Sequence, residues 1–118
     1  MDFIERMLNI AAKEAIKRNA IDKRCFRLGS VGIRSDGAIV YSRNTSNYIK
    51  NRKIHAEYRL SKKLDYYGIV FVARVLRDGS LGMARPCPDC VRALKSRRVR
   101  KVYYSIANNE YGCINLEK

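Results

Sequence analysis

The amino-acid sequence predicts a three-layer α/β sandwich around a mixed five-stranded sheet, with residues 1–118 forming a single domain. Helix-like and strand-like segments follow one another in the order α-β-β-α-β-α-β-β, the alternation expected when helices cover a sheet. The final connection is too short to contain a crossover helix, so the last two strands should run antiparallel. A chain of 118 residues, 47% of them hydrophobic, is large enough for one core and too apolar for a disordered protein.

The first segment, residues 2–19, has the pattern of an amphipathic helix. Asp2 stands where a capping residue is expected, and Glu5 three residues later completes a capping-box pattern. Apolar residues recur at three- and four-residue spacing and predict one buried stripe, made by Phe3, Met7, Ile10, Ala11, Ala15 and Ile16.

Two strands, residues 25–34 and 38–43, are predicted on either side of Ser35-Asp36-Gly37. An Asp-Gly pair between runs of branched and aromatic residues is a good signal for a β-hairpin. Gly29 and Gly32 indicate a bulge or bend in the first of these strands. A polar loop, residues 44–53, follows the second strand.

The rest of the chain alternates helices with strands. Residues 55–67 carry apolar positions along one side of a helix that Gly68 ends, and the apolar run 69–76 has the profile of a strand buried on both faces. A loop over 79–85 leads to a short helix over 86–97, where Pro86 suits the first position because its missing N–H costs little there. Strands over 99–106 and 111–116, joined by a turn at 108–110, complete the order.

The net charge of +14, from 25 Lys and Arg against 11 Asp and Glu, is the unusual property of the composition. Such an excess favours binding to polyanions through long-range attraction and counterion release. The alternative is a basic, solvated surface without a partner. Charge therefore indicates a class of partner and identifies no reaction.

The cysteines and the apolar runs indicate the compartment. Cys87 and Cys90 form a C-x-x-C downstream of a histidine, which indicates metal binding rather than a disulfide framework. Cys25 and Cys113 are isolated in strand-like surroundings and are expected to be small buried hydrophobes. No signal-peptide pattern and no run of membrane-spanning length is found, so we expect a cytoplasmic protein that does not contact membranes.

Two short stretches carry the chemistry, His55-Ala56-Glu57 and Pro86-Cys87-Pro88-Asp89-Cys90. One imidazole and two thiolates suit tetrahedral zinc, and three protein ligands leave a fourth position for water, as in catalytic zinc sites. Both stretches should begin helices, whose N-terminal partial charge favours thiolates. Glu57 is close enough in sequence to His55 to handle the protons of that water. The alternative is a structural zinc module in which Glu57 is an ordinary solvated acid.

This H-x-E…P-C-x-x-C pattern resembles the cytidine deaminase-like superfamily, whose zinc enzymes act on nucleobases. The resemblance implies that Zn²⁺ is held by His55, Cys87 and Cys90, and that Glu57 is the general acid and base for hydrolytic deamination at C4 of cytosine or C6 of adenine. Deamination of cytosine to uracil is preferred over adenine because the chain is short and lacks the extra C-terminal helix that the transfer-RNA enzymes use. It also implies that backbone N–H groups near Ala56 and Cys87 help to hold the attacking water and the developing charge.

The resemblance mixes two branches of that superfamily. A histidine as the first ligand is similar to deoxycytidylate, transfer-RNA adenosine and polynucleotide deaminases. The antiparallel last strands instead resemble free-cytidine, blasticidin and toxin deaminases. Asn44 closes the second predicted strand, where related enzymes carry an asparagine that contacts the sugar; the alternative is a loop asparagine that favours a turn.

The basic residues beside the motifs indicate the form of the substrate. Lys50, Arg52 and Lys53 lead into the histidine, and Arg85 directly precedes Pro86, so these four cations are expected to rim the zinc pocket. One phosphate needs one or two such residues, whereas a polynucleotide track uses more. Single-stranded DNA or RNA is therefore favoured over a free (deoxy)cytidine monophosphate.

Several points stay open from the sequence. Tyr48 or Tyr103 is considered for stacking on the base, although eight tyrosines leave no single one preferred. The competing class of function is a catalytically inactive, basic nucleic-acid-binding zinc module, which would have no need of Glu57. Assembly into a homo-oligomer is also left open.

Overall fold

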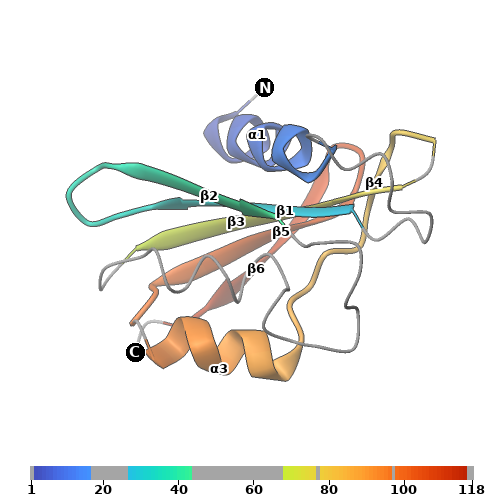
Figure 1. Cartoon of the computed structure of the whole chain (residues 1–118). Helices are drawn as coiled ribbons and strands as arrows, with labels where there is room; N and C mark the ends of the chain where they lie inside the picture. Colours follow the sequence, from blue (N-terminus) through green and yellow to red (C-terminus); the bar gives the residue numbers. More distant parts are fainter. Residues whose placement is uncertain (1, 17–26, 44–67, 77, 97, 117–118) are drawn as a thin grey trace.

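The computed structural model of the chain describes residues 2–16, 27–43, 68–76, 78–96 and 98–116. Figure 1 shows that the helices of these described residues lie on opposite faces of a sheet. The elements in chain order are α1 (Phe3–Ile16), β1 (Arg27–Ile33), β2 (Ile39–Arg43), β3 (Ile69–Val75), β4 (Leu81–Gly82), α3 (Pro88–Ser96), β5 (Lys101–Ala107) and β6 (Glu110–Asn115). The helix predicted over 55–67 lies outside the described residues.

The strands form one mixed sheet in the order β2-β1-β3-β5-β6, with β4 paired to β3. Among the strands that the structure describes, β3 and β5 run parallel and the other pairings are antiparallel. The prediction of antiparallel last strands is confirmed by the β5–β6 register. The chain is therefore an α/β protein with a mostly antiparallel mixed sheet.

The prediction of five strands and of a loop over 79–85 is wrong at β4. The parallel strands β3 and β5 pair only from Ile69 to Val72. Beyond that point Gly82 pairs with Arg74 of β3, and the Ala84 N–H donates to the Ser105 carbonyl of β5 at 2.9 Å. The segment that leaves β3 thus turns back and lies between the ends of β3 and β5, where their backbone groups would otherwise lack partners.

Helix α1 begins with the predicted capping box. The Glu5 N–H donates to Asp2 Oδ1 at 2.7 Å, and the Asp2 N–H donates to Glu5 Oε1 at 3.2 Å. The Tyr111 hydroxyl of β6 donates to Asp2 Oδ2 at 3.2 Å. The pKa of Tyr111 is raised above its usual value of 10.0. Partial desolvation contributes most, and the hydrogen bond to Asp2 and the charges of nearby carboxylates add to it. These contacts fix the start of α1 against the edge strand.

The buried face of α1 differs in part from the predicted stripe. Met7, Ala11 and Ala15 are buried as expected, together with Leu8 and Glu14. Three members of the predicted stripe are exposed, namely Phe3 at 55%, Ile10 at 36% and Ile16 at 48%. The apolar residues of this helix occupy more than one face, and the sheet covers only one of them.

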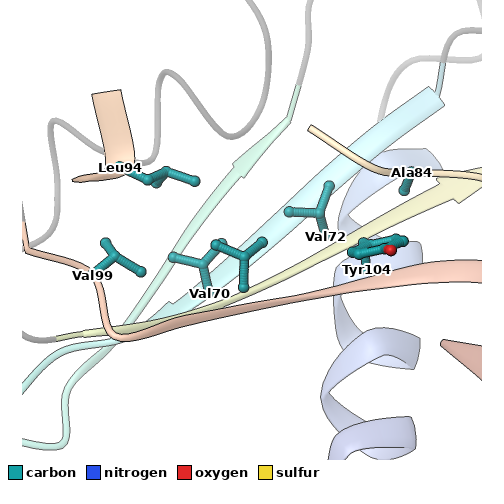
Figure 2. Packing of buried hydrophobic residues seen from close by; sticks show 7 residues of the cluster. Val70, Val72, Ala84, Leu94, Val99 and Tyr104 are labelled. Carbon is teal, nitrogen blue, oxygen red and sulfur yellow. The ribbon is translucent and has the colours of Figure 1, made fainter. Parts of the chain in front are cut away.

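Two apolar clusters pack on opposite faces of the sheet. On the α1 face, Met7, Leu8 and Ala11 contact Val31, Phe71 and Ala73. On the α3 face the cluster consists of Val70, Val72, Ala84, Leu94, Val99, Val102 and Tyr104 (Figure 2). Successive residues of β3 point to opposite faces, so β3 is buried on both sides, as its apolar run predicted.

Cys113 does not follow its prediction. It is exposed on β6, an edge strand, and pairs in register with Tyr103 of β5. Tyr103 packs against the α1 cluster, so Cys113 lies on the α1 face, where the helix contacts mainly β1 and β3. Cys25 lies outside the described residues. None of the described helices combines the length and apolar composition that a membrane span requires.

Candidate functional site

The C-x-x-C motif lies at the N-terminus of α3. The Val91 N–H donates to the Cys87 carbonyl at 3.0 Å, so Cys87 is the residue that precedes the first helical turn. Pro88 is the first residue of α3, and the prediction that Pro86 opens the helix is wrong by two positions. Pro88 suits this position for the reason given for Pro86, because a fixed φ and a missing N–H are favourable at the first helical residue.

The two thiols of the motif converge. Cys87 Sγ lies 3.2 Å from Cys90 Sγ, with Cys90 fully buried and Cys87 half-buried. Cys90 precedes Leu94 by one helical turn, so both lie on the face of α3 that packs on the sheet. Cys90 is therefore fixed by packing in the core, whereas Cys87 is partly accessible to solvent.

This thiol pair fits a tetrahedral metal. Two thiolates on one zinc ion at its usual bond length are about 3.8 Å apart, slightly wider than the observed separation and within reach of a small side-chain rotation. His55, the predicted third ligand, and Glu57 lie outside the described residues. Within the described ranges, no three His, Cys, Asp or Glu side chains gather into a metal-binding group.

Arg85, two residues before Cys87, is held by an aromatic side chain of β5. Arg85 Nη1 donates to the Tyr104 hydroxyl at 3.0 Å, and the guanidinium carbon lies 5.6 Å from the centre of the Tyr104 ring. Arg85 itself is exposed, whereas Tyr104 is buried. The structure thus brings together three of the predicted site residues, Arg85, Cys87 and Cys90, on one short segment beside the α3 face of the sheet.

Tyr104 was not among the residues that the sequence singled out. It pairs in register with Gly112 of β6, and a Cβ at Gly112 would come within 2.5 Å of the Tyr104 ring and hydroxyl. A tyrosine opposite a glycine on neighbouring antiparallel strands is the available sequence signal, because an aromatic ring can lie over a missing side chain. It becomes specific only once the register of β5 and β6 is known.

Tyr103 does not serve as a stacking residue for this site. Its ring stacks on Phe71 with 5.4 Å between ring centres and 12° between planes, within the α1 cluster. The thiol pair lies with α3 on the opposite face of the sheet (Figure 1). Cys113 is excluded as a further ligand to the thiol pair for the same reason.

The remaining predicted site residues lie outside the described residues, and the structure tests none of them. They are Asn44, Lys50, Arg52, Lys53, His55, Ala56 and Glu57, together with Tyr48.

An open hollow of about 780 Å³ lies elsewhere, between the end of α1 and the turns that follow β3 and β5. Asn9, Lys13, Asp78 and Asn109 are among its polar lining residues. Hydrogen bonds from the side chain and backbone of Ser80 hold the pKa of Asp78 below its usual range. Neither cysteine of the motif nor Arg85 lines this hollow, so it is separate from the candidate site.

A scan of the chain against protein-family models finds no match, and a search of curated proteins finds none either. The function of this chain is therefore inferred from the site residues themselves and from the chemistry that their types and positions allow.

Proposed function

We propose that the chain is a zinc-dependent hydrolase that deaminates cytosine to uracil, with single-stranded nucleic acid as its substrate. The observation that supports this most is the pair of thiols, 3.2 Å apart at the start of α3, on a segment that also carries Pro86. His55 and Glu57 complete the residue types that a nucleobase deaminase requires, in the spacing of the signature. The mixed sheet with antiparallel last strands is compatible with that superfamily.

In this proposal His55, Cys87 and Cys90 hold the zinc ion. Zinc in such a site supplies a Lewis acid that makes water nucleophilic near neutral pH. Glu57 would accept a proton from the water that adds to C4 of cytosine and pass it to ring N3. It would then move the proton of the new C4 hydroxyl to the amine, so that the C4–N bond breaks, ammonia departs and the C4 carbonyl of uracil forms. The backbone N–H of Ala56 stabilises the developing charge.

The form of the substrate follows from the cations around the motifs. Lys50, Arg52, Lys53 and Arg85 supply more positive charge than one phosphate needs, within a chain of net charge +14. Asn44 contacts the sugar in this proposal. A free cytidine or deoxycytidine monophosphate is the alternative substrate, because one or two of these cations are enough for a single phosphate.

The test offers cytidine, CMP, dCMP, single-stranded DNA and single-stranded RNA to the zinc-loaded full chain and follows uracil formation. Turnover of a polymer, with binding that weakens steeply as salt is added, is the expected result. Turnover of a monophosphate alone would replace the polymer with the free nucleotide. Absence of uracil from every substrate would contradict the enzyme proposal.

A catalytically inactive, basic zinc module is the competing class of function. It predicts zinc binding and salt-dependent nucleic-acid binding without any product. The presence of Glu57 beside His55 favours the enzyme, because an inactive zinc module has no proton to move.

A further inference from the structure

The Arg85 guanidinium is fixed by the fold rather than free in solvent. A long, exposed arginine ordinarily loses side-chain entropy when it binds a ligand. Here the Tyr104 hydroxyl accepts a hydrogen bond from Arg85 Nη1 at 3.0 Å, and the guanidinium carbon lies over the Tyr104 ring, 5.6 Å from its centre. Part of that ordering cost is therefore met before any ligand arrives.

Tyr104 is itself held rigidly. It is 8% exposed, belongs to the α3-face cluster with Val72 and Ala84, and lies over Gly112 so closely that a methyl group there would overlap it. The Ala84 N–H donates to the carbonyl of Ser105, the residue after Tyr104 on β5, at 2.9 Å. This bond fixes the backbone directly before Arg85. The Arg85 side chain and the backbone of the preceding residue, Ala84, are thus both bonded to β5.

The charge of Arg85 is not neutralised in the part of the chain that the structure describes. Arg92 pairs with Asp89, and Arg34 pairs with Asp36, but no described carboxylate forms an ion pair with Arg85. The bond to Tyr104 uses one guanidinium N–H, and an arginine has five such donors in a planar fork. The other donors suit a phosphate, which accepts charge-assisted and often bidentate bonds from arginine.

We propose that Arg85 binds a phosphate group of the substrate and that Tyr104 is the positioning residue that holds Arg85 for it. The inference rests on the proposed function in one respect, namely that the phosphate belongs to the cytosine nucleotide presented at the Cys87–Cys90 pair. That phosphate is either the monoester of a free nucleotide or a diester of a polynucleotide backbone, and both offer the same oxygen acceptors.

The test compares deoxycytidine, dCMP and a short single-stranded oligonucleotide with one cytosine, using the zinc-loaded full chain. Arg85→Gln should raise KM about tenfold or more for the substrates whose phosphate it contacts, with little change in kcat and none for deoxycytidine. An effect on dCMP identifies the monoester, and an effect on the oligonucleotide alone identifies the backbone. An equal effect on all three substrates, or no effect, would overturn the proposal.

Tyr104→Phe keeps the ring in the core and removes the hydroxyl that accepts from Arg85. It should raise the same KM about threefold, leave deoxycytidine unaffected and leave the unfolding midpoint nearly unchanged. In an Arg85→Gln background the Tyr104→Phe change should have no further effect on KM, since the two residues act as a unit. Additive effects would show that Tyr104 acts on structure alone and would overturn its positioning role.

Arg6→Gln provides the matched control, because it removes the same charge from an exposed position on α1, on the other face of the sheet. It should leave all three substrates unchanged. Calorimetric binding of dCMP against deoxycytidine separates this inference from the proposed function. Tighter dCMP binding that Arg85→Gln abolishes would support the phosphate site even without turnover. The same comparison is made for the oligonucleotide, and the phosphate site is rejected if neither dCMP nor the oligonucleotide shows binding that depends on Arg85.

Discussion

The Ser105 hydroxyl lies at the point where β3 and β5 diverge, and it satisfies two backbone groups there. It accepts from the Arg74 N–H at 3.1 Å and donates to the Gly82 carbonyl at 2.7 Å. Ser105 is fully buried, so water does not replace these bonds if the hydroxyl is removed. A single side chain thus stabilises the junction of three strands from which the segment carrying Arg85 and Cys87 departs.

Ser105→Ala should destabilise the protein by about 2 kcal/mol, because a buried N–H and a buried carbonyl each lose a partner. Ser30→Ala is the matched control: Ser30 is also fully buried in a strand, but its hydroxyl has no hydrogen-bond partner in the described part of the chain. That change should leave the free energy of unfolding within about 0.5 kcal/mol of the wild-type value or increase it. Equal losses in urea denaturation would contradict this account of Ser105.

At the scale of elements, the close approach of α1 to β1 depends on Gly29. A Cβ at Gly29 would overlap the Ala11 carbonyl oxygen and lie 2.6 Å from the Ala15 backbone N. Both atoms belong to the helix backbone, so no side-chain rotation relieves the overlap. The helix can lie this near to the sheet only because position 29 has no side chain.

Gly29→Ala should therefore destabilise the protein by about 1–3 kcal/mol, the range for overpacked cores. The loss should be concentrated in α1, whose amides would exchange with solvent faster than those of β5. Native-state hydrogen exchange together with urea denaturation measures both. Unchanged stability and unchanged protection of α1 would show that the packing of α1 on β1 does not depend on this glycine.

Elements whose signal is local were predictable from the sequence. The capping box of Asp2 and Glu5, the hairpin between β1 and β2, and the doubly buried β3 each depend on residues that are neighbours in the chain. The position of the C-x-x-C at a helix start was predictable for the same reason. The helix begins at Pro88 and not at Pro86. Both prolines have the fixed φ that favours a helix start, so the local sequence does not show which of them is the first helical residue.

Features that depend on distant partners were not predictable. Leu81 and Gly82 are too short a run to show strand periodicity, and they pair only because β3 and β5 separate. The hydrogen bond from Arg85 to Tyr104 depends on how β5 pairs with β6 and on the path of the chain after β4. The exposure of Phe3 and Ile16 also depends on distant residues, because it is set by which side of α1 faces the sheet. The spacing of apolar residues along the helix does not give that position.

In the molecule as a whole, the two faces of the sheet carry different sets of residues. The α1 face holds the Phe71–Tyr103 stack and the exposed Cys113, and contributes packing. The α3 face holds the thiol pair, with the anchored Arg85 beside it. A chain of net charge +14 would attract a polyanion from a distance, and in the proposed function a few cations near Cys87 then align it.

The most direct test of the proposed deamination compares the zinc-loaded wild type with Glu57→Gln on single-stranded DNA that contains one cytosine. Glutamine keeps the shape of the side chain and cannot transfer the protons, and it leaves His55, Cys87 and Cys90 in place. If Glu57 transfers the protons, the wild type should form uracil, and Glu57→Gln should do so at a rate lower by roughly 100-fold or more at equal zinc content. Equal rates from the two proteins would contradict the proposed deamination, as would a zinc-loaded wild type that forms no uracil from this DNA, from RNA or from the free nucleotides.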